Sequence, residues 1–282
     1  MGRIARSWEL VKQSFRILRS DKELMLLPIT SAISCVVVSV VILSGGALAF
    51  LPEIKASLAT NAHWQPNGPG MWACLFVFYL ANYFIIVFFN VALVSAASSR
   101  LAGGQATIDD GLQAAWERKG RIFQWALLAA TVGILLRMME ERMSSIGRLV
   151  ARLIGVAWTL ASYFVVPVLA AEDLGPVQAL KRSAQVFRET WGEKVVGGFS
   201  FGLIFMLLAL PGMAFPLLGA AVGPAGMIVG SSLMVLYWLL LGVVSAATEG
   251  IFTAALYRYA TTKQVSAGFR LENFSMAWQP KR

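Results

Sequence analysis

The sequence has little of what catalysis in solution requires. Its 282 residues include a single histidine, His63, and two cysteines, Cys35 and Cys74, and only 14% of the residues are charged. It contains no zinc-ligand pair, phosphate-binding loop, nucleophile elbow or dinucleotide fingerprint. Both cysteines fall inside apolar runs, as small core residues do. We therefore expect a protein that is not an enzyme and that has no disulfide framework, no cofactor and no metal site.

Apolar residues dominate the composition. The chain is 57% hydrophobic and has a mean hydropathy of +0.67, which is typical of integral membrane proteins. The net charge of +9 and the pI of about 9.9 would suggest nucleic-acid binding in a soluble protein. Here the cations cluster beside the apolar runs, where membrane topology and anionic lipid account for them. We expect membrane lipids, anionic ones above all, as partners, and no nucleic acid.

Six apolar runs are candidates for membrane spans, because about 20 apolar residues cross a bilayer as a helix. They cover residues 24–51, 72–95, 122–137, 146–171, a stretch that starts near Val195, and 225–248. The third run is short unless it continues through Met143, and the sixth helix can continue to Tyr259. Pro211-Gly212 predicts a kink in the fifth span. Between the first two spans we expect a loop from Pro52 to Met71.

A basic amphipathic helix is predicted before the fifth span. Gly175-Pro176 supplies a break, after which apolar residues recur at steps of three and four: Val177, Leu180, Ala184, Phe187 and Trp191. A shift of 169 residues aligns this line with Trp8, Val11, Phe15, Leu18 and Lys22, which predicts a similar helix within residues 1–23. A weaker copy covers residues 108–121. Thr107 and Asp110 introduce it as a loose match to a helix start.

These patterns predict an all-α membrane protein. We expect six transmembrane helices arranged as three hairpins, each preceded by a basic amphipathic cytoplasmic helix, within a single polytopic domain of residues 1–282. The approximate units are 1–97, 98–171 and 172–259, followed by a polar tail at 260–282. Internal triplication would explain the three similar units. The alternative is that basic amphipathic segments simply occur often beside spans, and the sequence leaves both explanations open.

The distribution of cations predicts the orientation in the membrane. In a six-span topology, 19 of the 24 Lys and Arg residues fall on the side of the two termini. Because cytoplasmic segments carry the excess of Lys and Arg, we expect both termini in the cytoplasm. The weakest part of this assignment is the opposite turn between Arg137 and Arg152, where Arg148 and Arg152 must pair or extend toward the membrane surface.

Two groups of residues are candidate site residues. The second span has the most polar stripe, formed by Tyr79, Asn82, Tyr83 and Asn90, and Glu249 is the one acidic residue embedded late in a span. These five either line a cavity or hold helices together, and Glu249 can also pair with an arginine near the cytoplasmic end of its span. The candidate lipid-headgroup contacts are Lys12, Arg16, Arg19, Lys181, Arg182 and Arg188.

Several stretches resemble an uncharacterised family of bacterial six-helix membrane proteins. They are residues 7–15, 21–24, 163–167, 172–191 and 255–260. The resemblance covers nearly the whole chain and implies a bacterial inner-membrane location, without a known substrate. The segment Ala179 to Ser183 before a span is also loosely similar to the membrane domain of glycerophosphodiester phosphodiesterases. The chain has no room for their soluble barrel, so this likeness implies architecture and no catalytic residue.

Two functions from different classes fit these features. The first is transport or binding of a lipid or another amphiphile, since internal repeats and broken helices such as residues 211–226 recur in transporters. The second is a non-catalytic structural or partner subunit of a membrane complex, either a homo-oligomer or an assembly with another membrane protein. The scarcity of charges within the spans favours an apolar cargo, or no cargo, over coupling to ions.

Overall fold

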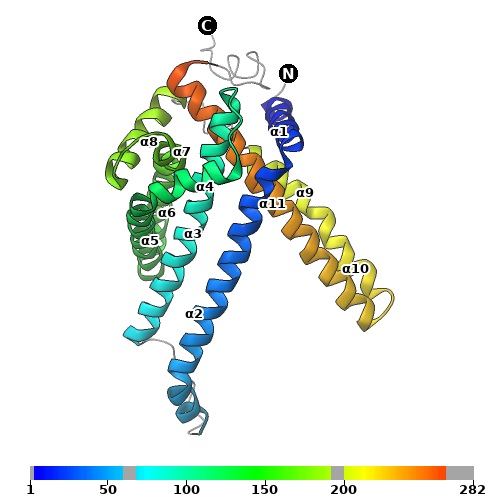
Figure 1. Cartoon of the computed structure of the whole chain (residues 1–282). Coiled ribbons are helices and arrows are strands. Elements are labelled where there is room, and N and C mark those ends of the chain that lie inside the picture. The colour runs from blue at the N-terminus through cyan, green and yellow to red at the C-terminus, as the bar shows by residue number, and fades with distance from the viewer. Residues whose placement is uncertain (1–2, 60–67, 192–199, 265–282) are drawn as a thin grey trace.

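The computed structural model describes residues 3–59, 68–191 and 200–264, and within these ranges every regular element is a helix (Figure 1). The helices are α1 (Arg3–Ser20), η1 (Lys22–Met25), α2 (Leu26–Ala59), α3 (Pro69–Leu101), α4 (Ile108–Glu117), α5 (Lys119–Arg142), α6 (Ser145–Ser162), α7 (Val165–Ala171), α8 (Pro176–Trp191), α9 (Ser200–Ala209), η3 (Leu210–Met213), α10 (Ala214–Ala220) and α11 (Pro224–Thr262). Five of them, with α6 and α7 taken as one, are long and apolar enough to cross a membrane, and a shorter apolar stretch covers Ile204–Ala220.

The long helices pack in three pairs, which we call the arms. The pairs are α2 with α3, α5 with α6, and α10 with α11. In Figure 1 all three arms leave the same end of the molecule, and the α10–α11 arm diverges from the α2–α3 arm. The side chains along the arms are mostly apolar and exposed, including Leu48 at 68%, Leu217 at 73% and Ile228 at 69%. The arms therefore offer apolar surface to their surroundings.

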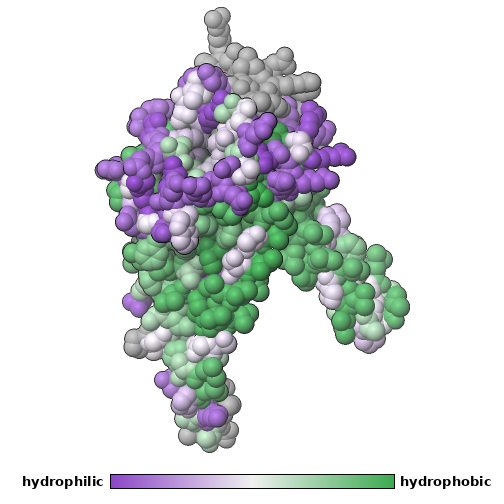
Figure 2. All heavy atoms as spheres, in the orientation of Figure 1, coloured by the Kyte–Doolittle hydropathy of each residue, from purple (hydrophilic) through white to green (hydrophobic). Residues whose placement is uncertain are grey.

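The remaining helices form a hydrophilic end, which we call the collar. It consists of α1, α4 and α8 with α7 and the last turns of α11 (Figure 2). Each amphipathic helix rests on the end of an arm: α4 on α3, α8 on α6 and α7, and α1 on α11. The most buried large side chains gather beneath the collar, among them Leu24, Trp125 and Phe164. The hydrophobic core thus lies where the collar meets the arms.

Close backbone contact holds the α10–α11 arm together. Gly226 and Gly230, four residues apart, lie on the face of α11 that meets α10. A Cβ atom at Gly230 would clash with the Phe215 carbonyl, and one at Gly226 would clash with the Gly219 carbonyl. The absence of a side chain lets the two helices approach this closely. The kink expected at Pro211-Gly212 is confirmed as the 3-10 helix η3 between α9 and α10.

The predicted loop after Pro52 is wrong, because α2 continues through this proline to Ala59. A proline inside a helix removes one backbone hydrogen bond, and the strong helix formers that follow it, residues 53–59, continue the helix. The third span extends to Arg142, the longer of its two expected limits. The expected start of the fifth span near Val195 lies outside the described residues.

The fourth span covers Ile146–Ala171, as the sequence predicts, and the structure adds an interruption within it. Its two parts, α6 and α7, are separated at Tyr163 and Phe164. A proline ring clashes with the carbonyl four residues earlier, and for Pro167 that carbonyl belongs to Tyr163. The Phe164 N–H, freed by the break, donates to Ser183 Oγ of α8 at 2.9 Å in a buried position. Ser183 of the collar therefore replaces the backbone acceptor that the Phe164 N–H lacks at the break.

Candidate functional site: the collar and the polar residues of the arms

The first collar helix buries only part of the apolar line that the sequence predicts, because Phe15 is 46% exposed. Val11, Ser14 and Leu18 are buried against the rest of the protein. The three candidate headgroup contacts on this helix, Lys12, Arg16 and Arg19, are exposed. In Figure 1, α1 lies at the edge of the collar, and it packs on α11.

The third collar helix, α8, has the same design with one exception. Ala179, Ser183 and Val186 are buried, and the candidate contacts Lys181 and Arg188 are exposed. Arg182 instead donates from Nε to Glu172 Oε1 at 3.0 Å. This hydrogen bond raises the pKa of the Arg182 guanidinium above its ordinary value. The Arg182 cation is therefore engaged within the protein.

Glu172 connects three parts of the fold. The same oxygen that accepts from Arg182 of α8 also accepts a hydrogen bond from the Tyr257 hydroxyl of α11. Glu172 itself follows α7 directly, and the next residue, Asp173, pairs with Arg121 at the start of α5. The acidic pair that the sequence places beside a helix start therefore links α5, α8 and α11.

A second ionic cluster ties the first helix pair to the collar. Arg100, near the end of α3, pairs with Asp21, and its Nε donates to the Ala106 carbonyl at 2.7 Å. Asp21 is the N-cap residue of η1, but its side chain makes no capping hydrogen bond. The Asp21 carboxylate instead forms the ion pair with Arg100, which lies far from it in the sequence. Together these contacts fix the loop that leads into α4.

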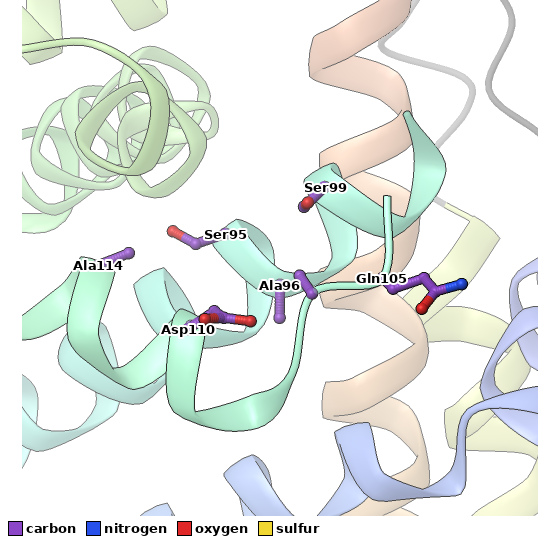
Figure 3. A pocket seen from close by; sticks show the side chains of 8 residues that line it. Ser95, Ala96, Ser99, Gln105, Asp110 and Ala114 are labelled. Carbon is purple, nitrogen blue, oxygen red and sulfur yellow. The ribbon is translucent and has the colours of Figure 1, made fainter. Parts of the chain in front are cut away.

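The start of α4 borders a shallow depression. Thr107 and Asp110 form a capping box: the Asp110 N–H donates to Thr107 Oγ1 at 3.2 Å, and the Thr107 N–H donates to Asp110 Oδ2 at 2.7 Å. This confirms the expected helix start, and the bonds lower the pKa of Asp110. Ser95 and Ser99 of α3, Gln105 of the loop and Asp110 of α4 surround the depression (Figure 3).

Two of the polar residues of α3 lie on contacts between helices. Ser39 of α2 donates to Asn82 Oδ1 at 3.2 Å, and Asn82 Nδ2 donates to the Phe78 carbonyl at 2.9 Å. The Tyr79 hydroxyl accepts from Arg137 of α5 at 3.2 Å. Tyr83 is 37% exposed. Asn90 is half-buried further along the same helix. The structure therefore places Asn82 at the contact with α2 and Tyr79 at the contact with α5.

Glu249 lies on α11, away from the α3 residues that contact α2 and α5. It is eight residues before Tyr257, or about 12 Å along the helix. Its residue surface is exposed, and its carboxylate interacts electrostatically with Tyr163. The carboxylate thus faces the surface of the arm beside the break between α6 and α7.

The chain was compared with models of known protein families. A family of unknown function, DUF6159, matches residues 70–269. The chain belongs to this family. The match to DUF6159 begins in the first turn of α3 and includes α4 to α11, so it contains two of the three collar helices and all of the second and third arms. The expected membership of an uncharacterised family is confirmed. Neither curated proteins nor solved structures gave a match.

One feature of this DUF6159 protein was missed at the level of the sequence. Along α6, a polar face consists of Arg148, Arg152, Gly155, Thr159 and Ser162, at steps of four, three, four and three. Arg148, Arg152 and Thr159 are exposed. The steps of four and three between these residues are visible in the sequence. The stretch is nevertheless as apolar on average as the other spans, so it was interpreted as an ordinary span. The two arginines were considered only as charges near the helix start.

Proposed function

We propose that this DUF6159 protein is a non-enzymatic integral protein of the bacterial inner membrane that binds and transports lipids or similar amphiphiles. The observation that carries the proposal is the division of the surface in Figure 2, with a hydrophilic collar at one end and apolar arms below it. Burying a Leu, Ile or Val side chain away from water is worth about 1.5–3 kcal/mol. The many exposed side chains of this kind on the arms support a lipid environment.

The proposed topology has six spans with both termini in the cytoplasm. It takes α9, η3 and α10 together as the span that accompanies α11, because Ile204–Ala220 is apolar and roughly 25 Å long. The collar then lies at the cytoplasmic surface, and the arms point outward across the bilayer. The concentration of Lys and Arg in the collar segments supports this orientation.

The collar supplies the contact with anionic lipid. A Lys or Arg beside an anionic membrane surface contributes about 1 kcal/mol. Arg16 and Arg19 on α1 and Lys181 and Arg188 on α8 are exposed beside buried apolar faces, which is how interfacial helices present their charges. Arg182 is left out of this set because Glu172 holds it.

The test is lipid retention by the purified full chain. Arg16, Arg19, Lys181 and Arg188 are replaced together by Glu, and phosphatidylglycerol bound per protein is measured from mixed micelles of phosphatidylglycerol and phosphatidylcholine. Four cations at about 1 kcal/mol each predict more than a tenfold loss of the preference for phosphatidylglycerol. Lys55→Glu, at the far end of α2, is the control and should retain the preference. An unchanged preference in the fourfold variant contradicts the proposal.

A second candidate function is a structural subunit of a membrane complex, with copies of itself or with another membrane protein. The observation that favours it is that two polar residues of α3, Tyr79 and Asn82, are hydrogen-bonded to neighbouring helices. Under this function, Asn82→Leu lowers stability by about 0.6–2 kcal/mol and leaves bound lipid per folded protein unchanged. Paired measurement of melting temperature and bound lipid separates the two functions.

A further inference from the structure

We infer that the polar face of α6 is a path along which phospholipid headgroups cross the bilayer, so that the protein equilibrates phospholipids between the two leaflets without an energy source. The inference rests on the proposed function, since it names the site and the substrate class of the transport. It starts from the face formed by Arg148, Arg152, Gly155, Thr159 and Ser162.

The polar face of α6 is nearly as long as the hydrocarbon core of a bilayer is thick. Its residues follow the 3.6-residue period of a helix, so they lie on one side. From Arg148 to Ser162, 14 residues later, the helix rises about 21 Å, and α6 as a whole extends about 27 Å. The hydrocarbon core of a bilayer is about 30 Å thick. The face therefore covers most of the membrane, as a path between leaflets requires.

The polar face of α6 is exposed on the protein surface. Polar residues in membrane helices normally point into the protein, because contact with hydrocarbon is costly. Here the Arg152 side chain is 71% exposed, and Thr159 is exposed as well. The contact of α6 with α5 uses other residues, such as the buried Ala151 and Trp158, which stacks on Trp125. Polar headgroups and their water are the surroundings that suit such a face.

The polar face of α6 carries both hydroxyl groups and charged groups. Thr159 Oγ1 donates to the Gly155 carbonyl at 2.9 Å and Ser162 Oγ to the Trp158 carbonyl at 2.8 Å, so each hydroxyl oxygen can still accept a hydrogen bond. Near the tip of the arm, Arg152 pairs with Glu140 at 3.0 Å. Although it is paired, the Arg152 side chain is 71% exposed and can still face a phosphate, whereas the paired Arg182 side chain is only 32% exposed. The two hydroxyl oxygens can accept hydrogen bonds from water or from the glycerol hydroxyls of phosphatidylglycerol.

The α5–α6 arm has a short apolar length between the charged residues of α5. On α5, Arg121 and Arg137 are 16 residues apart, or about 24 Å, and both are held by acidic partners. A hydrophobic length below about 30 Å is accommodated by local thinning of the bilayer. At the collar end, α8 packs on α6 and carries the exposed Lys181 and Arg188, which can receive a headgroup. The path is thus short and has polar groups at both ends.

The experiment uses the full chain in proteoliposomes of phosphatidylglycerol and phosphatidylcholine with a trace of fluorescent phosphatidylcholine. A membrane-impermeant reductant bleaches the outer leaflet only, unless lipid crosses the bilayer. We expect the protein to make lipid of both leaflets accessible, and the double variant Thr159→Val, Ser162→Ala to slow this about tenfold, which corresponds to about 1.4 kcal/mol in the barrier.

The matched control is Thr30→Val, Ser44→Ala on α2. These hydroxyls are exposed and also bond to carbonyls of their own helix, at 2.7 and 3.1 Å, but they lie on another arm. The control should exchange lipid as fast as the natural chain. Equal rates for both double variants would overturn the inference, as would a natural chain that retains phosphatidylglycerol but never exposes the inner leaflet. In that last case lipid binding by the collar stands, whereas loss of both would refute the proposed function as well.

A partner helix on α6 is the competing explanation of the polar face. A cysteine at position 159, in a chain with Cys35 and Cys74 replaced by alanine, distinguishes the two. When a photoreactive maleimide is attached to this thiol, the inference predicts crosslinks to lipid. Crosslinks to a second copy of the chain, without lipid exchange, would overturn it.

Discussion

At the scale of single residues, two buried serines show how similar positions differ in energy. Ser14 and Ser183 are aligned by the 169-residue shift, and both are fully buried in the collar. Ser183 accepts the Phe164 N–H released by the helix break, whereas Ser14 Oγ is buried without a partner. The same residue type therefore satisfies a backbone donor at one position and leaves a hydroxyl unsatisfied at the other.

This difference predicts opposite results for the same substitution. Ser183→Ala strands the buried Phe164 N–H and should lower the free energy of unfolding by about 1–3 kcal/mol. Ser14→Ala removes an unsatisfied polar atom and should be neutral or slightly stabilising. Thermal unfolding in detergent, followed by circular dichroism, measures both. Equal losses of stability would show that Ser183 does not compensate the break.

At the scale of elements, the sequence was informative wherever a regular period decided the structure. The 3.6-residue period located α1 and α8, and the capping pair Thr107 and Asp110 located α4, because these signals are local. The break at Tyr163 was not predicted, since the effect of Pro167 falls four residues earlier and the compensating Ser183 is 19 residues later. Contacts between distant residues have no period, so they are invisible in one sequence.

The same reasoning applies to the candidate sites. Polar residues in spans were recognisable by type, but their partners, such as Ser39 for Asn82 and Arg137 for Tyr79, come from other helices. Likewise, Arg182 looks like Lys181 and Arg188 in the sequence, and only the position of Glu172 separates them. The identity of candidate residues could be predicted, whereas the role of each depended on tertiary contacts.

The packing of α10 on α11 gives a prediction at this scale. Gly230→Ala places a methyl group against the Phe215 backbone and should separate the helices, at a cost of about 1–3 kcal/mol. Gly242→Ala is the matched control on the same helix, because nothing lies within 4 Å of its Cβ position. It should be neutral or stabilising by up to about 1 kcal/mol, since alanine favours helix. Comparable melting temperatures for the two variants would contradict the close contact.

At the scale of the whole molecule, the collar contacts follow a cyclic order. The helix that begins the second unit rests on the arm of the first, the one that begins the third rests on the arm of the second, and α1 rests on α11 of the third. A triplicated unit would close into a ring in this way. We keep internal triplication as a proposal, with units 1–97, 98–171 and 172–259, and the cyclic order supports it.

The central claim is that the collar faces the cytoplasm while the arms cross the membrane. It is tested most directly by labelling single cysteines in intact cells with a membrane-impermeant maleimide, after Cys35 and Cys74 are replaced by alanine. Ala59→Cys, at the exposed far end of α2, should label from outside, and Gln264→Cys, just after α11, should label only once the cells are permeabilised. Labelling of Gln264→Cys from outside, with Ala59→Cys protected, would contradict the account.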